Sequence, residues 1–123
     1  MTNTGKIYSF RDLKIWQNGL LIAKEAYLLT KKLPKEELFG LISQIRRAAV
    51  SVSSNIAEGR GRSTRKDFCQ FLHITMGSLA ELETQLIIAD TIYGKIEINK
   101  LLDMIHEEQR MTSSMLSKLK ANS

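Results

Sequence analysis

The sequence predicts an all-α protein that folds as an up-down-up-down antiparallel four-helix bundle. In four separate segments, apolar residues recur at steps of three and four, which places each set on one face of a helix. None of these segments alternates with period two, and one proline among 123 residues argues against a loop-rich β fold. The breaks between the segments are short, so sequential helices must be antiparallel neighbours.

The predicted helices span about residues 11–32, 36–58, 64–93 and 97–120 of one domain that covers residues 1–123. The first begins an apolar stripe at Leu13 and ends before Pro34, because proline disfavours α geometry in the residue that precedes it. Its stripe comprises Leu13, Trp16, Leu20, Ala23, Tyr27 and Thr30. We expect the residues before Phe10 and after Lys120 to fray.

Glycines and one capping pattern bound the other helices. Gly59 and Gly61 end the second helix, Thr64 with Asp67 resembles a capping box at the start of the third, and Gly94 closes it. The second stripe comprises Leu38, Ile42, Ile45, Ala49, Val52 and Ile56. The third comprises Phe68, Leu72, Thr75, Leu79, Leu82, Leu86, Ala89 and Tyr93, and the fourth Ile98, Leu102, Ile105, Gln109, Thr112, Leu116 and Leu119.

Three helices carry more apolar residues than one bundle face needs. The additional residues are Ile15, Leu21, Ile22, Leu28 and Leu29 in the first helix, Phe71, Ile74, Ile87 and Ile88 in the third, and Leu101, Met104, Met111 and Met115 in the fourth. Spare apolar surface favours a homo-oligomer. The alternative is that a small domain simply exposes some apolar side chains, which is common.

Composition and motifs point away from membranes and from catalysis. No apolar run approaches the roughly 20 residues of a membrane span, and the first residues lack a signal peptide, so we expect a cytoplasmic protein. His106 has no second histidine at zinc-motif spacing, and Gly59 and Gly61 lack the pattern of a phosphate loop. The lone Cys69 excludes an internal disulfide. We therefore expect no enzyme activity, no metal and no cofactor.

Charge is the clearest signal of a partner. Antiparallel topology places the chain termini and the connection between the second and third helices at one end. That end carries Lys6, Arg11, Lys14, Arg60, Arg62, Arg65, Lys66, Lys118 and Lys120 against only Asp12, Glu58 and Asp67. Such segregation is typical of contact with RNA or DNA phosphates, which is salt-dependent and weakly sequence-specific. The alternative is that these cations only aid solubility or stabilise helix C-termini.

A second hypothesis concerns assembly. If the hairpin turns near Gly61, Gly77 falls roughly opposite Ile45 and Ser78 near Gln44, and these small residues would let the two helices approach closely. Arg46 or Arg47 could then reach Glu81. We expect a buried or interfacial pair between an arginine and Glu81 that specifies register or assembly. The alternative is a solvated helix face.

Four blocks of the chain together resemble a known family. They are FRDLKIWQ at residues 10–17, FGLISQIRRAAVS at 39–51, SNIAEG at 54–59 and GSLAELETQL at 77–86. In this order they resemble the small four-helix-bundle proteins encoded within intervening sequences of 23S rRNA genes, over about residues 8–120. One departure is Val52-Ser53, where that family often has Ile-Pro.

The resemblance implies a homopentameric ring and supplies no catalytic residues. The chain is also distantly similar to the accessory bundle of diversity-generating retroelements, a pentamer that engages nucleic acid and a reverse transcriptase. That similarity implies a non-enzymatic accessory protein with a possible protein partner. It implies RNA or DNA contacts at Arg46, Arg47, Arg60, Arg62, Arg65 and Lys66. The alternative is a protein-interaction or scaffold bundle with no nucleic-acid role.

Overall fold

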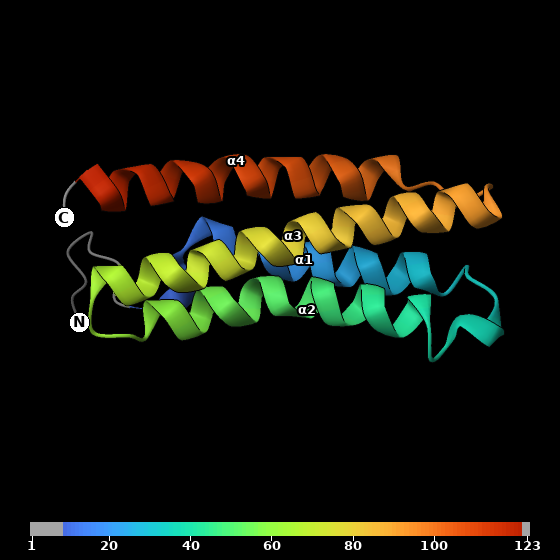
Figure 1. Ribbon diagram of the computed structural model, residues 1–123, viewed down its shortest axis with the longest axis horizontal. Coiled ribbons are helices and arrows are strands. Elements are labelled where there is room, and N and C mark those ends of the chain that lie inside the picture. Colours follow the sequence, from blue (N-terminus) through green and yellow to red (C-terminus); the bar gives the residue numbers. More distant parts are fainter. Residues whose placement is uncertain (1–8, 122–123) are drawn as a thin grey trace.

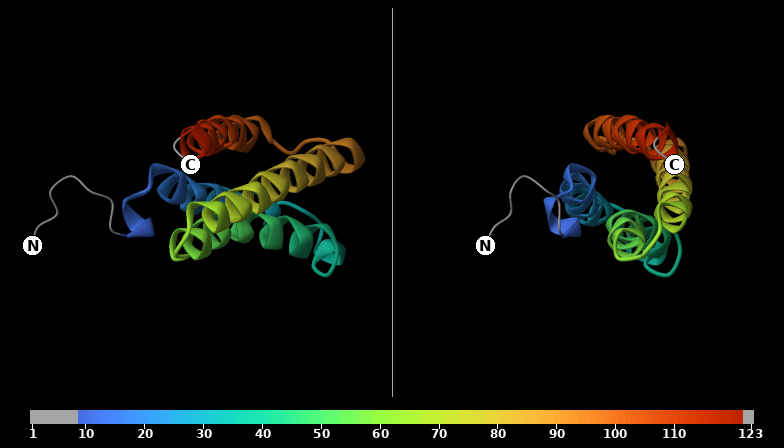
Figure 2. Two further views of the ribbon diagram at one scale, coloured as in Figure 1. Left: turned by 60° about the vertical axis from the view of Figure 1, so that its left-hand side comes forward. Right: turned by 90° about the vertical axis from the view of Figure 1, so that its left-hand side faces the viewer.

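The structure, a computed structural model, describes residues 9–121 as four helices that run alternately in opposite directions (Figure 1). They are α1 (Lys14–Thr30), α2 (Leu41–Arg60), α3 (Arg65–Tyr93) and α4 (Asn99–Ala121). Each helix packs beside the next, and α4 returns to contact α1, as the end view in Figure 2 shows. The predicted all-α four-helix bundle is confirmed. The expected fraying concerns residues 1–8 and 122–123, which lie outside the described residues.

Two predicted helix starts are too early. Residues Phe10–Asp12 form a separate 3₁₀ turn, in which the Ser9 hydroxyl accepts the N–H of Arg11 at 3.1 Å, so α1 begins only at Lys14. A second 3₁₀ turn, η2 (Lys35–Glu37), precedes α2. The Glu37 carboxylate accepts the N–H of Leu41 at 3.1 Å and caps α2 there. At the other predicted boundaries, Thr64 accepts the N–H of Asp67 and Gly94 closes α3 with a φ of 61°.

The predicted core face is correct for α2 and α3 and wrong for α1. In α1, Leu20 and Tyr27 are exposed, while the predicted spare residues Ile15, Ile22 and Leu29 are buried with Gly19 and Ala26. Apolar residues occur nearly all round α1, so their spacing fits more than one stripe. In α2, Leu38 is also exposed, because it precedes the helix.

Small residues set the register between α2 and α3, and Ser78 is one of the two that the sequence suggested, but with a different partner. Ser51 and Ser78 face each other with 2.6 Å between their hydroxyl oxygens, so Ser78 lies opposite Ser51 and not Gln44. Gly77 is exposed with open space around it. The close approach occurs at Gly59, where a Cβ would lie 2.5 Å from the Cβ of Phe71. As predicted, Gly61 ends α2, whereas Gly59 is part of the packed helix.

The fourth helix buries polar groups in the core. Glu108 is fully buried, and its Oε1 accepts a hydrogen bond from Asn18 of α1 at 3.0 Å. Its other oxygen, and the hydroxyl of Thr112 one turn later, have no hydrogen-bond partner in the described chain. Burial raises the pKa of Glu108 to about 7, and the hydrogen bond from Asn18 opposes this rise. The predicted stripe placed Gln109 in the core, whereas Gln109 is half-buried.

We expect Gly59→Ala to destabilise the fold by about 1–3 kcal/mol, because the new methyl group would force α3 away from α2. Gly61→Ala is the matched control. A Cβ there meets its nearest neighbours at 3.6 Å or more, and the residue has an ordinary helical φ of −79°. Urea unfolding of both variants measures the difference. Equal stability of the two variants would contradict the close approach at Gly59.

We expect stability to fall as pH rises, because Glu108 binds its proton more tightly in the folded chain than in the unfolded chain. The contribution of Glu108 to the free energy of unfolding is complete below the unfolded pKa of 4.5. It decreases as the pH rises, until the pH passes the folded pKa of about 7. The shift corresponds to a loss of about 3 kcal/mol. Glu108→Gln should remove this decline, and Glu107→Gln, an exposed neighbour, should not. The measurement is urea unfolding from pH 4 to 8, and a decline that persists in Glu108→Gln would refute the assignment.

Candidate nucleic-acid interface

Six cations gather at one end of the bundle. The end of α2, its connection to α3 and the end of α4 lie together there, on the left of Figure 1. Arg60, Arg62 and Arg65 line one hollow with Phe68 and Leu119. A neighbouring hollow is lined by Arg65, Lys66 and Lys120. We call the following residues the basic end: Arg60, Arg62, Arg65, Lys66, Lys118 and Lys120.

Local contacts hold the arginine-rich connection in place. Thr64 caps α3, so the positive end of the helix dipole adds to the side-chain charges. The guanidinium of Arg62 donates to Glu58 at 2.8 Å and lies over the ring of Phe71, 4.9 Å from its centroid. This arrangement fixes Arg62 and pairs part of the local charge. Phe71 and Phe68 are half-buried, since both pack near Gly59.

The other predicted basic residues are Lys6, Arg11 and Lys14. Lys6 lies outside the described residues. Asn18 contacts Glu108 on antiparallel helices, so Lys14 lies near the level of residue 112, about two turns short of Lys120. Arg11 lies in the turn that precedes α1, and this turn packs against α2. Lys14 is therefore the described basic residue that the structure separates from the basic end.

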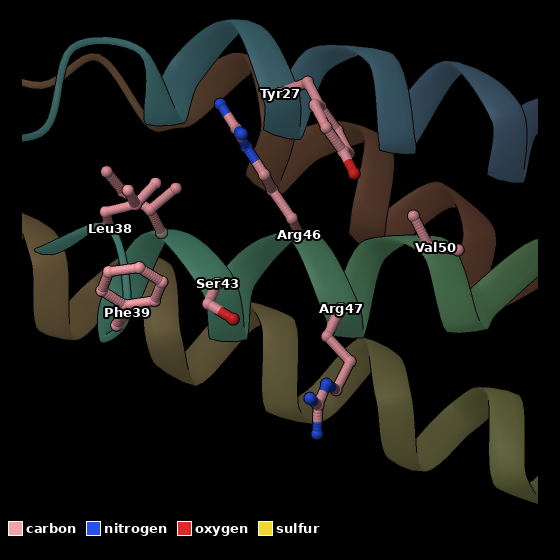
Figure 3. Close-up of a pocket in the computed structure, with 8 residues that line it drawn as sticks. Tyr27, Leu38, Phe39, Ser43, Arg46, Arg47 and Val50 are labelled. Atoms are coloured by element: carbon pink, nitrogen blue, oxygen red, sulfur yellow. The ribbon is translucent and has the colours of Figure 1, made fainter.

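The structure also separates Arg46 and Arg47 from the basic end. Thirteen helical residues between Arg47 and Arg60 correspond to about 20 Å along α2. Arg46 turns toward α1, where its Nε donates to Thr30 at 2.9 Å and its guanidinium lies 4.4 Å from the centre of the Tyr27 ring. Arg47 projects to the other side of α2 (Figure 3). Of the six residues predicted to contact nucleic acid, the structure brings four together.

Glu81 is exposed on α3 and forms no ion pair with Arg46 or Arg47 among residues 9–121. The expectation of a buried pair is therefore wrong, because the side chain of Glu81 points outward while its neighbour Leu82 fills the core. A pair between two copies of the chain stays a prediction.

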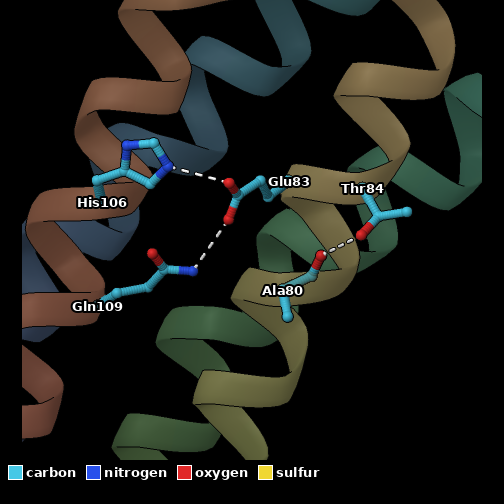
Figure 4. Close-up of polar contacts among 5 residues, drawn as sticks. All are labelled: Ala80, Glu83, Thr84, His106 and Gln109. Carbon is cyan, nitrogen blue, oxygen red and sulfur yellow. Dashed lines mark hydrogen bonds and ion pairs between the residues drawn. The ribbon is translucent and has the colours of Figure 1, made fainter.

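Glu83, for which the sequence predicted no partner, links α3 to α4. Glu83 bonds with His106 at 3.0 Å and accepts the side-chain amide of Gln109 at 3.3 Å (Figure 4). The His106 hydrogen bond is the main cause of a lowered pKa at Glu83. In the same view, the Thr84 hydroxyl bonds to the carbonyl of Ala80 in its own helix. These hydrogen bonds join two helices. Among residues 9–121, the side chains bonded to Glu83 include no Ser, Thr or Cys that could act as a nucleophile.

Sequence reasoning also missed an exposed aromatic residue. Phe39 is 92% exposed between η2 and α2, beside a hollow lined by Tyr27, Ile42 and Val50. One sequence signal could have found it. Phe39 lies outside the predicted apolar stripe and directly before Gly40, where a helix start is easily interrupted.

Within residues 9–121, no group of three or more His, Cys, Asp or Glu side chains could hold a metal ion. No helix in the same range is both long and apolar enough to cross a membrane.

The chain matches the sequence profile of a known family. No curated protein matches the chain. A sequence profile described as "23S rRNA-intervening sequence protein" matches residues 11–114, which is most of the chain and includes three of the four blocks named above and all but Phe10 of the first. The distant similarity to retroelement accessory bundles stays a prediction. Because the profile covers α1 to α3 and most of α4, the chain belongs to the 23S rRNA-intervening sequence protein family.

Proposed function

We propose that this chain is a non-enzymatic, cytoplasmic homo-oligomer that contacts RNA or DNA through its basic end, as an accessory protein. The observation that carries the proposal is the convergence on one end of the bundle of five cations in the ends of α2, α3 and α4 and of Arg62 in the connection between α2 and α3. Against them, Glu58 pairs with Arg62, Asp67 lies in the first turn of α3, and Asp12 lies in the turn before α1 that packs against α2. The surface therefore keeps an excess of positive charge that phosphates can neutralise.

The contact would read the phosphate backbone and not the bases. Lys and Arg side chains on a short connection can follow phosphates, but base stacking needs exposed aromatic rings. Phe68 and Phe71 are half-buried against α2, so neither offers a free ring face at the basic end. We expect binding that depends strongly on salt and little on sequence.

Assembly would strengthen this contact. Exposed apolar residues on α1, α2 and α3, including Leu21, Leu28, Val50, Ile74 and Ile88, support burial against further copies. The family resemblance favours a homopentamer. Cyclic symmetry would bring five basic ends to one side of the particle.

The alternative is a protein-interaction or scaffold bundle whose basic end only aids solubility. The exposed Phe39 supports this alternative, because aromatic residues are enriched at protein interfaces. A direct test of nucleic-acid binding separates the two functions.

We expect the triple variant Arg60→Gln, Arg62→Gln, Arg65→Gln to bind a 20-nucleotide RNA or DNA at least about tenfold more weakly than the natural chain at 50 mM salt. Removing three phosphate contacts should also reduce the slope of log K against log salt by about two to three. Fluorescence anisotropy of the labelled oligonucleotide measures both quantities.

The matched control removes the same charge from the opposite end, by Lys31→Gln, Lys32→Gln and Lys35→Gln. These lysines are exposed on the last residues before η2 and within it. Equal weakening by both triple variants would show that net charge alone attracts the polyanion. Absence of binding by the natural chain would support the scaffold function.

We expect light scattering after size exclusion to find a particle near five times the chain mass of 14.0 kDa. The physical reason is burial of the exposed apolar side chains against neighbouring copies. A chain that stays monomeric at micromolar concentration would remove assembly from the proposed function and leave the basic end to be tested alone.

A further inference from the structure

An open groove between α1 and α2 is lined by apolar side chains together with Ser43 and two arginines, Arg46 and Arg47. Tyr27 of α1 and Ile42 and Val50 of α2 line a hollow of about 500 Å³, and Leu38 and Phe39 stand at one end of it (Figure 3). Phe39 makes little contact with its own chain, since 92% of its surface is exposed. Aromatic rings left outside in this way are typical of residues that anchor a protein interface. Arg47 lies at the edge of the groove.

A second unpartnered surface runs along α3. Ile74, Glu81 and Ile88 are spaced by seven residues, so they lie on one face of the helix, and all three are exposed. A carboxylate thus stands between two isoleucines on a helix face that the chain itself leaves uncovered. Within residues 9–121, Glu81 has no hydrogen bond or ion pair.

Arg47 and Glu81 complement each other in charge but do not pair within the chain. The contact between Ser51 and Ser78 sets the register, so Arg47, one turn before Ser51, lies near the level of Glu81 on the neighbouring antiparallel helix. Both side chains are exposed, and no ion pair joins them in the described chain. Each charge is left available beside an apolar surface.

From these observations we infer that the α3 stripe of a second copy of this chain seats in the α1–α2 groove, with Glu81 of one copy paired to Arg47 of the next. Ile74 and Ile88 each lie about 10 Å from Glu81 along α3, and Val50 lies about 4.5 Å beyond Arg47 along α2. Leu38 and Phe39 lie on the other side of Arg47, just before α2 begins. With Glu81 paired to Arg47, one isoleucine therefore faces Leu38 and Phe39, and the other lies beyond Val50. This inference rests on the homo-oligomer of the proposed function and names its contact.

The groove and the stripe are different surfaces, so each copy can offer its groove to one neighbour and its stripe to another. Contacts of this kind repeat from copy to copy and close into a ring when the rotation allows. The helix-in-groove arrangement also uses a common mode of recognition, in which residues one or two turns apart serve as anchors.

Charge reversal tests the contact. Arg47→Glu and Glu81→Arg should each raise the concentration of half-dissociation at least about tenfold, because like charges would face each other across the interface. The variant that carries both changes should recover assembly. Sedimentation velocity over a dilution series measures this concentration, and circular dichroism checks that each variant keeps its helices.

Mixing distinguishes a contact between copies from one within a chain. In an equimolar mixture of Arg47→Glu and Glu81→Arg, opposite charges meet only across interfaces between unlike chains. We expect the mixture to assemble better than either variant alone. Recovery in the double variant but not in the mixture would overturn the inference, since it would place the pair within one chain.

An apolar pair of variants tests the groove itself. Phe39→Ser should weaken assembly, whereas Ile87→Ser should not, because Ile87 points about 100° away from Ile88 around α3. If the natural chain assembles and none of these variants changes the assembly, this contact is wrong and the proposed oligomer stands. If the natural chain is monomeric at every concentration, the assembly in the proposed function fails as well.

Discussion

The close packing of α2 against α3 is the constraint on which the other features depend. At Gly59 the helices approach so closely that no side chain fits, and Phe71 occupies the space that a Cβ would need. Further along, Ser51 meets Ser78, and Thr75 donates to the carbonyl of Val52 at 3.3 Å. These contacts fix the register of the hairpin. The register places the arginine-rich connection at the end of the bundle and brings Arg47 and Glu81 to one level.

The fourth helix is held by different means. Asn18 reaches Glu108 from α1, and Glu83 of α3 bonds with both His106 and Gln109. Polar contacts of this kind are directional, so they select one rotation and height of α4 among several that apolar packing would accept. These contacts require the carboxyl group of Glu108 to be buried, and burial favours its protonated form. Helix α4 is therefore well positioned but sensitive to the ionisation of one residue.

Sequence reasoning predicted the helices, their order and the core faces of α2 and α3, because each of those faces has one clear stripe. It failed for α1, where Leu20 and Leu21 continue the apolar surface round the helix. It also failed for Glu108, since spacing cannot show that a carboxyl group has a partner on another helix. For the candidate site, the basic segment Arg60–Lys66 could be predicted because its charged residues are close together in the sequence. Arg46 and Arg47 lie far from this segment because of the length of α2. Their different environments depend on the directions of their side chains, which the spacing of residues does not determine.

The two proposed surfaces use different parts of the bundle, and this division links their energetics. The groove and the stripe run along the flanks, whereas the basic end lies at the end of the helices. Copies joined by their flanks would keep the basic end accessible. Each copy that joins a ring would add repulsion between neighbouring basic ends, and a bound polyanion would remove that repulsion. Because coupling between two binding events is reciprocal, a polyanion that favours assembly must bind the assembled particle more tightly than the single chain.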